Sequence, residues 1–485
     1  MSNTLKLIKL SAIVLFLIMT SCVDYKGLVD PYSKAPASKT SIWQNPSKKE
    51  TPFTKATIPN ELKDKKLTLA ELLDIGLINN PITYKTWAMA RSAASSYAST
   101  LSSYFPEADL IGTYTREKES VYSSGIFGHT KPVHYYQTII TPEASLSYTI
   151  FDFGLRKSTS AAALQTFYYA GFIHNQQLQA VTRTIMDDYY NYQYQKQLMV
   201  ANEADLENAR MSLDSAQQKF IAGIASVGDV TQAKTKYLEM KLQLISQENV
   251  VKTTFANLAK DLGLDANNFF DVQEFPKEIL TNMQIESIDS LVFTAQTQRQ
   301  DYLAMQSQIS AKEELVKQAK AESLPLLTTD FDIGRNYYNG NVNDDYHFTL
   351  GFKISFPLFR GFYFKNKEKQ AQANLEQAMS SLTQTKLTII GQITIAHNDV
   401  LSAKDTMKCS EEYLKEAKKR FDIALASYKA GTVTILDVIA AQSSLADARA
   451  QKVKAEKDWF ASLSNLAYAT GSLSIPLENE EKNEN

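Results

Sequence analysis

The sequence predicts an α+β protein made of two tandem repeats, each containing long coiled-coil helices and one β-hairpin. Three observations support this fold class. Two long tracts, residues 143–275 and 358–475, contain no proline. Short segments between them alternate apolar and polar residues. Finally, the second half of the chain repeats the pattern of the first half.

The proline-free tracts are open to very long helices, because proline is the strongest helix breaker. Leu414, Ala417, Phe421, Ala424 and Tyr428 follow a 3-4-3-4 spacing, and a similar spacing continues after the turn from Leu436 to Val453. This is coiled-coil periodicity with small residues in the seam. A helix over 155–222 would be about 100 Å long at about 1.5 Å per residue.

The alternating segments predict half-buried strands. In "HFTLGFKISF" the apolar members of the alternation are Phe348, Leu350, Phe352, Ile354 and Phe356. "LTTDFDI" shows the same period, "ASLSYTI" shows it more weakly, and "ADLIGTY" is ambiguous. Each half is therefore predicted to carry one hairpin, and the second hairpin turns through "NGN" at 339–341.

The internal repeat is clearest in "FIAGIASVGDV" at 220–230 and "YKAGTVTILDV" at 428–438, which lie 208 residues apart. Gly263 and Gly471 share that offset, whereas Leu72 and Leu291, upstream of the hairpins, are 219 residues apart. The difference of 11 residues falls inside the hairpins. We interpret it as a longer loop in the first hairpin, at about Arg116 to Gln137, because loops tolerate insertion.

These patterns divide the chain into segments. The predicted boundaries are a signal peptide at 1–21, an N-terminal tether at 22–66, repeat 1 at 67–264, a mixed connector at 265–287, repeat 2 at 288–471 and a polar tail at 472–485. Repeat 1 has its hairpin at about 107–151 and a tip turn at about 222–227; repeat 2 has them at about 326–358 and 430–435.

The N-terminus predicts export. Lys6 and Lys9 precede the apolar run "LSAIVLFLIM", and Cys22 follows in "MTSC", which resembles a bacterial lipobox with Met19 in place of the usual leucine. We expect lipidation of Cys22, against the alternative of an ordinary cleavage site nearby. Cys22 and Cys409 are the two cysteines of the chain, so lipidation of Cys22 leaves Cys409 without a disulfide partner. A net charge of −2 argues against a nucleic-acid partner.

Four amphipathic strands are too few to close a barrel. Open sheet edges in lipid would leave backbone groups without hydrogen-bond partners, so several copies would have to pool their strands. Two copies would give eight strands, three twelve and four sixteen, and the physical argument permits all three.

The order of the short motifs resembles the TolC-like outer-membrane efflux proteins, and specifically their lipidated branch. These motifs are "CVDYKG" at the lipid site, "LINNP" at 77–81, "FP" and "LP" before the hairpins, "FPLF" at 356–359, and the paired "AG" turns followed by "DV". The resemblance implies a homotrimer with a twelve-stranded outer-membrane β-barrel on a periplasmic α-helical barrel. It also implies a periplasmic adaptor and an inner-membrane pump as partners, and export of small molecules or proteins by a tripartite efflux or type I secretion complex.

The resemblance assigns roles to the repeated stretches. Ala222, Gly223, Ile224, Ala430, Gly431 and Thr432 correspond to tips that dock the adaptor; the alternative is that each glycine serves only the tight turn. Asp229 and Asp437 correspond to carboxylates of the periplasmic gate. The spacing from Ser226 and Thr434 also fits capping boxes. Gln232 and Ala440 stand where the family often has a second aspartate.

No catalytic motif or cofactor is predicted. The histidines at 129, 134, 174, 347 and 397 lack ligand spacing, and no phosphate loop or nucleophile motif occurs. The rival hypothesis is a lipid-anchored periplasmic coiled-coil scaffold without a pore, for which the apolar strand face from Phe348 to Phe356 would have no use. The cargo, whether drug, metal or protein, is not evident from the sequence.

Overall fold

The computed structural model describes residues 29–36, 38–42, 66–124, 130–265, 270–275, 285–339 and 345–473. The chain divides into two compact units. The first contains residues up to Ala35, with 91–169 and 306–380, and the second contains 36–90, 170–305 and the chain from 381 onward. Cys22 and the predicted signal peptide lie outside the described residues.

The described helices and strands confirm two tandem repeats. Repeat 1 contains α3 (Leu69–Asn79), α4 (Pro81–Leu101), β2 (Glu107–Ser124), β3 (Thr130–Phe151), α5 (Leu155–Ile221) and α6 (Val227–Asp261). Repeat 2 contains α7 (Ile288–Gln298), α8 (Gln300–Ala321), β5 (Leu326–Tyr338), β6 (Asp345–Ser355), α9 (Tyr363–Ala430) and α10 (Ile435–Thr470). The two long helices have 67 and 68 residues, as the proline-free tracts predicted.

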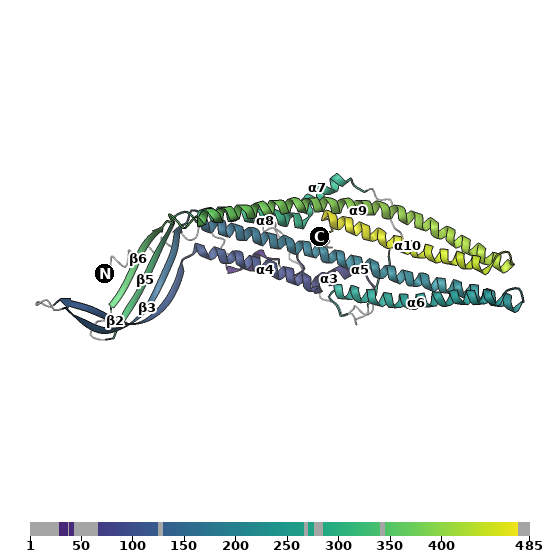
Figure 1. The fold of residues 1–485 in the computed structure, drawn as a ribbon, viewed down its shortest axis with the longest axis horizontal. Coiled ribbons are helices and arrows are strands. Elements are labelled where there is room, and N and C mark those ends of the chain that lie inside the picture. Colours follow the sequence, from purple (N-terminus) through teal and green to yellow (C-terminus); the bar gives the residue numbers. More distant parts are fainter. Residues whose placement is uncertain are drawn as a thin grey trace, which may run out of the picture. The chain divides into compact units, whose positions relative to one another are not determined.

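Figure 1 shows α6 running back along α5, and α10 running back along α9. Leu155 and Tyr363, which begin the long helices, are separated by the same 208 residues as the repeated stretches. In the part of the chain that the structure describes, no helix is long and apolar enough to cross a bilayer.

The four strands form one antiparallel sheet in the order β2-β3-β5-β6 (Figure 1). β2 and β3 pair along their whole length, from Glu107 with Ser147 to Ser124 with Thr130. The predicted long loop at about Arg116 to Gln137 is therefore wrong, because Arg116 and Gln137 are both strand residues. The extra residues of repeat 1 lengthen its strands to 18 and 22 residues, against 13 and 11 in repeat 2.

Apolar clusters hold the described residues of the second unit together, including a small one around Trp459 between α9 and α10. The largest joins α3, α5, α6 and β4, with buried aromatic side chains at Tyr189, Tyr190, Phe255 and Phe275. A second joins α7, α9 and α10 around Ile393. A third, between the ends of the long helices, contains residues of all four helices, from Ala216 and Ala233 to Phe421 and Val438. Both helical hairpins therefore share one core in this region.

Two short elements join the ends of the repeats. β1 (Lys66–Leu67) pairs in parallel with β4 (Asp271–Val272), so the start of repeat 1 is hydrogen-bonded to the connector after it. Asp271 also forms ion pairs with Lys66 at 3.5 Å and with Lys196 of α5 at 3.0 Å. The connector is thereby fixed to the long helix.

Residues 38–42 are docked on the helices. The Trp87 indole donates to the Pro36 carbonyl, and Ile42 packs against the large core cluster. The fully buried His174 lies 3.0 Å from the Ser41 carbonyl through Nε2 and 3.0 Å from the Thr86 hydroxyl through Nδ1. Because a carbonyl can only accept, Nε2 of His174 carries a proton. Burial lowers the pKa of His174 from 6.5 to about 4.

The buried imidazole predicts an acid-sensitive contribution to stability. The unfolded histidine takes up a proton near pH 6.5 and the folded one near 4, so the free energy of unfolding falls as the pH drops between these values. This shift corresponds to about 3 kcal/mol at 1.36 kcal/mol per pK unit. His174→Gln keeps a donor and an acceptor but cannot titrate. We therefore expect the variant to lose about 3 kcal/mol less stability than the unsubstituted protein between pH 7 and pH 4.

Unfolding in detergent, followed by helical circular dichroism, measures this difference. Burial raises the pKa of Asp188 to about 7, so Asp188 titrates in the opposite sense over part of the range. Its effect is common to both proteins and cancels in the comparison. Identical pH dependence of the two proteins would contradict the prediction.

Candidate functional site

The two helix tips have the same backbone turn. The N–H of Ile224 donates to the Lys219 carbonyl at 2.9 Å and that of Gly223 to Phe220 at 3.0 Å. In repeat 2, Thr432 donates to Ser427 and Gly431 to Tyr428, both at 3.0 Å. This is the Schellman motif, which ends a helix with a left-handed residue. Gly223 and Gly431 have φ of 74° and 86°, so the turn itself favours glycine at both positions.

All six predicted tip residues are exposed. A Cβ built on Gly223 or Gly431 would meet nothing within 4 Å. Gly263 and Gly471 have nearly the same φ, but a Cβ there would come within 2.6 Å of the Asn79 carbonyl oxygen and 2.9 Å of the Arg299 nitrogen. Close packing therefore requires glycine at positions 263 and 471. At the tip positions 223 and 431, only the backbone conformation favours glycine.

The tips differ in polarity. In repeat 1, Ile221, Ile224 and Val227 expose 84%, 72% and 64% of their surface. In repeat 2 the turn carries Ala430 and Thr432, and Leu436 is the exposed large apolar residue next to it. The first tip therefore presents three exposed apolar side chains, whereas the second tip is more polar.

Asp229 and Asp437 act as helix caps in this structure. Ser226 N–H donates to Asp229 Oδ2 at 3.0 Å, and the Asp229 N–H donates back to Ser226 Oγ at 3.2 Å. Thr434 donates to Asp437 Oδ2 through its N–H at 2.9 Å and through its hydroxyl at 2.7 Å. These hydrogen bonds lower the pKa of Asp437 below its ordinary value. Both carboxylates therefore stabilise the first turns of α6 and α10, whatever further role they have.

A contact that the sequence did not predict joins the two helical hairpins next to the tips. The Lys219 ammonium of α5 donates to the Tyr428 carbonyl of α9 and lies 4.3 Å from the centre of the Tyr428 ring. Burial, assisted by the nearby charge of Asp229, raises the pKa of Tyr428. The sequence predicted Tyr428 as a residue of the coiled-coil seam and as the first residue of the repeated stretch. Its partner lies 209 residues away, and no local pattern indicates it.

A second contact between the hairpins lies further from the tips. The buried Asp205 of α5 forms an ion pair with Arg449 of α10. Burial raises the pKa of Asp205, and the Arg449 guanidinium opposes that rise. The Gln442 amide also donates to the Asp205 backbone carbonyl at 3.4 Å. Polar side chains thus supplement the apolar contacts between the hairpins at two levels.

One face of the sheet is apolar and exposed. Phe348, Leu350, Phe352 and Ile354 on β6, and Phe356 just beyond it, are 52% to 75% exposed. Phe348 is paired with Ile333 and Leu350 with Phe331, so the apolar face continues onto β5. It extends through β3 to Leu110 on β2, which is 86% exposed. The predicted strand residues therefore belong to a surface that covers all four strands.

The opposite face of the sheet is polar. Glu143 accepts from His347 at 3.1 Å across the intervening Gly334, and the Thr141 hydroxyl donates to Asn336 at 2.8 Å. Asp330 and Asp332 of β5 lie on this face as well, by strand alternation. The two faces of the sheet thus differ in polarity.

Metal binding has no support in the described segments. No group of three or more histidine, cysteine, aspartate or glutamate side chains is placed there to hold an ion. The predicted tips belong to the second unit and the strand residues to the first. Lipidation of Cys22 stays a prediction, because that residue lies outside the described segments.

Comparison with known proteins identifies the class. Residues 72–264 and 291–472 match the family described as outer membrane efflux protein. The outer membrane protein TolC of Salmonella enteritidis is 22% identical over 411 residues, covering 82% of this chain and 80% of TolC. Protein CyaE of Bordetella pertussis is 23% identical, covering 80% of each chain. The crystal structure of VceC from Vibrio cholerae superposes with a TM-score of 0.73 at 19% identity, covering 83% of this chain and 96% of VceC.

The chain therefore belongs to the outer membrane efflux protein family. The family match covers both repeats and omits the connector between them. This membership confirms the resemblance to TolC-like outer-membrane efflux proteins, and the assignment to their lipidated branch stays a prediction. It makes the chain an outer-membrane channel component of tripartite efflux or secretion systems, extending into the periplasm.

The capping geometry generates a prediction about the tip carboxylates. Replacing Asp229 and Asp437 together by asparagine removes two charges but leaves an oxygen that can accept the capping hydrogen bonds. We expect unchanged thermal stability and a modest fall in cation preference in single-channel recordings, because carboxylates near a narrow opening attract cations. The modest size follows from Gln232 and Ala440, which carry no charge. Unaltered ion selectivity would leave helix capping as the sufficient role of both residues.

Proposed function

We propose that three copies of this chain form one channel. Their sheets would make a twelve-stranded outer-membrane barrel, and their helices a tunnel across the periplasm that exports small molecules or proteins. The observation that carries the proposal is the exposed apolar face, which spans a sheet with only four strands. β2 and β6 each pair on one side within the described residues, so each has an edge that needs a partner in lipid. The family resemblance favours three copies over two copies with eight strands or four copies with sixteen.

In this proposal the apolar face contacts lipid and the polar face lines the channel. Phe348, Leu350, Phe352, Ile354 and Phe356 would lie against acyl chains. Glu143, His347 and Asp332 would face water, where charged and hydrogen-bonding groups keep their hydration. A scaffold without a pore would have no use for an exposed apolar sheet, so this rival accounts poorly for the structure.

The tips would dock a periplasmic adaptor that links the channel to an inner-membrane pump. Ala222, Gly223, Ile224, Ala430, Gly431 and Thr432 are exposed, and the first tip carries an apolar surface around Ile224. An adaptor hairpin that buried these side chains would gain free energy from apolar contact. Asp229 and Asp437 would contribute charge to the periplasmic gate, in addition to capping their helices.

The remaining parts of the proposal concern export and anchoring. Residues 1–21 would direct secretion, Cys22 would carry fatty acids such as palmitate, and residues 22–66 would connect this anchor to repeat 1. The docking of residues 38–42 near His174 supports a tether that ends against the helices. No catalytic step and no cofactor forms part of this proposal.

A pair of arginine substitutions tests the lipid face. Phe352→Arg would place a charge in lipid and should cost about 2–4 kcal/mol per chain if the residue lies near the bilayer midplane. Gly351→Arg changes the adjacent residue, whose side chain would point to the polar face, where a Cβ meets nothing within 4 Å. We expect Phe352→Arg to reduce the yield of heat-resistant trimers in the outer membrane far more than Gly351→Arg does.

Crosslinking and gel mobility before and after heating provide the measurement. Equal yields for the two variants would contradict the lipid-face assignment. A purified protein that is monomeric in detergent would contradict the shared barrel.

The glycines test adaptor docking. Gly431→Lys and Gly471→Lys impose the same left-handed strain, but a side chain at Gly431 has free space and one at Gly471 collides with the backbone of Arg299. We expect Gly431→Lys to abolish transport and adaptor crosslinking while trimers persist, and Gly471→Lys to reduce folded protein itself. Gly431→Asn is the control for strain, because asparagine tolerates a left-handed backbone. Normal transport by Gly431→Lys would argue that the tip serves only the turn.

A further inference from the structure

One face of α10 is buried against the other helical hairpin of the same chain. Four side chains at helical spacing on this face are at most 2% exposed, namely Ile435, Val438, Gln442 and Leu445. The Gln442 amide donates to the Asp205 backbone carbonyl of α5 at 3.4 Å. Arg449, one turn after Leu445, forms the ion pair with the buried Asp205 carboxylate. This face of α10 therefore meets α5.

The corresponding face of α6 is largely open. At the repeat offset of 208 residues, the counterparts of the four buried residues are Val227, Val230, Lys234 and Tyr237. Val227 is 64% exposed, and Val230 and Tyr237 are half-buried. Lys234 and Lys241, the counterpart of Arg449, are exposed. The face that α10 buries within the chain is thus available on α6.

The partner face on α5 shows the same difference. Its buried residues Asp205, Asn208 and Ser212 lie on one side of the helix, at spacings of three and four residues. Their counterparts on α9 are the exposed residues Tyr413, Glu416 and Arg420. Each hairpin therefore has one face covered by the other hairpin of its chain and a repeat-related face that is left exposed.

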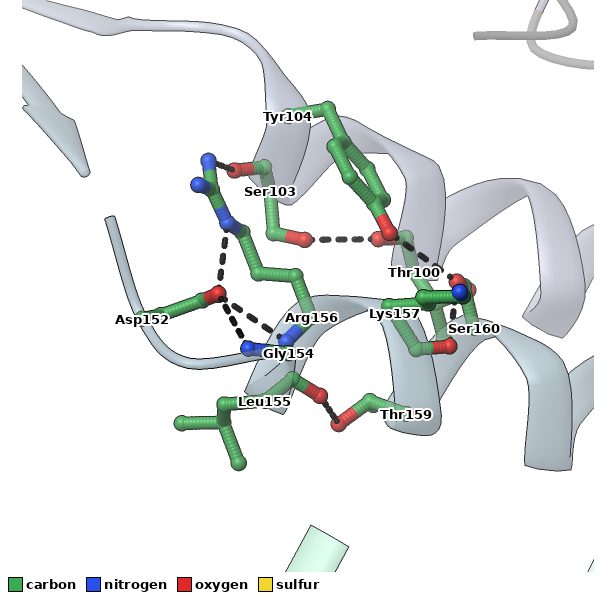
Figure 2. A network of polar contacts seen from close by, with 10 residues as sticks. All are labelled: Thr100, Ser103, Tyr104, Asp152, Gly154, Leu155, Arg156, Lys157, Thr159 and Ser160. Atoms are coloured by element: carbon green, nitrogen blue, oxygen red, sulfur yellow. Dashed lines mark hydrogen bonds and ion pairs between the residues drawn. The ribbon is translucent and has the colours of Figure 1, made fainter. Parts of the chain in front are cut away.

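Repeat-related positions can keep a contact while its chemistry changes. At the start of α5, Asp152 forms an ion pair with the Arg156 guanidinium at 2.7 Å, as Figure 2 shows. The counterparts at the offset of 208 residues are Arg360 and Phe364, and they are again in contact. The Arg360 guanidinium lies 5.5 Å from the centre of the Phe364 ring. An ion pair in repeat 1 is thus replaced by a cation–π contact in repeat 2.

The repeat offset predicts the contact between two copies. In a ring of hairpins, every hairpin has one neighbour from its own chain and one from the next copy. The exposed faces then place α9 of one copy against α6 of the next, as α5 lies against α10 within the chain. Asp205 with Arg449 is replaced by Tyr413 with Lys241, which again puts a cation beside an aromatic ring.

Charge complementarity favours a second copy as the partner of these faces. Asn208 and Gln442 are buried in the contact within the chain. Their counterparts Glu416 and Lys234 are exposed and carry opposite charges. Opposite charges at corresponding positions attract across an interface and fix its register. A partner of different sequence would not need charges at this repeat offset.

We propose that the exposed face of α6 binds α9 of a second copy of this chain, in the register that α10 adopts on α5 within one chain. Lys241 then lies beside the Tyr413 ring of the next copy, and Lys234 pairs with Glu416 of the next copy. This inference rests on the proposed channel of three copies. It adds the helix faces and the residue pairs through which the copies meet.

Crosslinking between differently tagged, co-expressed full-length chains tests this register. Both chains carry Cys409→Ser, which removes the exposed native cysteine. One chain carries Lys241→Cys and the other Tyr413→Cys, so a short bismaleimide can join these positions only between copies. We expect a product with both tags, at a yield many-fold above that of chains without the engineered cysteines.

The contact within the chain supplies a matched control. Asp205→Cys in one chain and Arg449→Cys in the other place the cysteines at a pair that meets within a single chain. We therefore expect little product with both tags from this combination. Heat-resistant trimers on unreacted gels confirm that each pair of chains has assembled.

The outcomes separate this inference from the proposed function. Trimers without a link between positions 241 and 413 would overturn the register and leave the proposed channel intact. A protein that forms no trimers would overturn the channel and the register together. A link between copies at positions 205 and 449 as strong as that at 241 and 413 would show that hairpins exchange between copies, and would also overturn the register.

Two charge variants provide a second test that uses no cysteines. Tyr413→Asp with Lys241→Arg transfers the internal ion pair to the boundary between copies, whereas Tyr413→Asp with Lys241→Asp places two like charges there. Both positions are exposed in the single chain, so its own fold does not depend on them. We expect the first variant to keep its heat-resistant trimers and the second to lose them several-fold. Equal trimer yields for the two variants would overturn the proposal.

Discussion

The fold is governed by the requirement that backbone N–H and C=O groups in a bilayer be hydrogen-bonded to protein. A sheet of four strands satisfies this within itself for β3 and β5, but β2 and β6 each leave one side open among the described residues. The exposed apolar side chains on one face of the same sheet are suited to contact with lipid, and the polar side chains on the other face are suited to contact with water. In the proposed channel, one chain supplies a segment of the barrel wall, and further copies close it.

Because of the internal repeat, the same glycine turn ends helices at several positions. Four helix ends use a glycine with φ between 71° and 86°, but only two of these glycines are packed against other backbone. Gly263 and Gly471 belong to the interior, where a Cβ would collide with a neighbouring helix. Gly223 and Gly431 belong to the tips, where surrounding space is free. The same backbone turn therefore stabilises the core in one place and leaves an accessible surface in another.

The contacts between the two helical hairpins are mixed in character. Ala216, Ala233 and Phe421 share an apolar cluster, whereas Lys219 with Tyr428 and Asp205 with Arg449 form polar contacts that are partly shielded from water. Charged groups that lose water gain from pairing and lose heavily when one partner is removed. Such contacts fix the register of one hairpin against the other more specifically than small apolar residues do.

The sequence by itself determined the class of elements, because helix and strand periods, proline-free tracts and the repeat are local properties. It predicted the long helices, the hairpins, and the alternation from Phe348 to Phe356. It misplaced the extra residues of repeat 1 in a loop between Arg116 and Gln137, because strand pairing depends on the partner strand. Only the tertiary structure decided that His174 holds residues 38–42 and that Lys219 meets Tyr428. These features depend on residues far apart in the chain. Tertiary packing brings such residues together, and no periodic pattern in the sequence indicates which of them will be in contact.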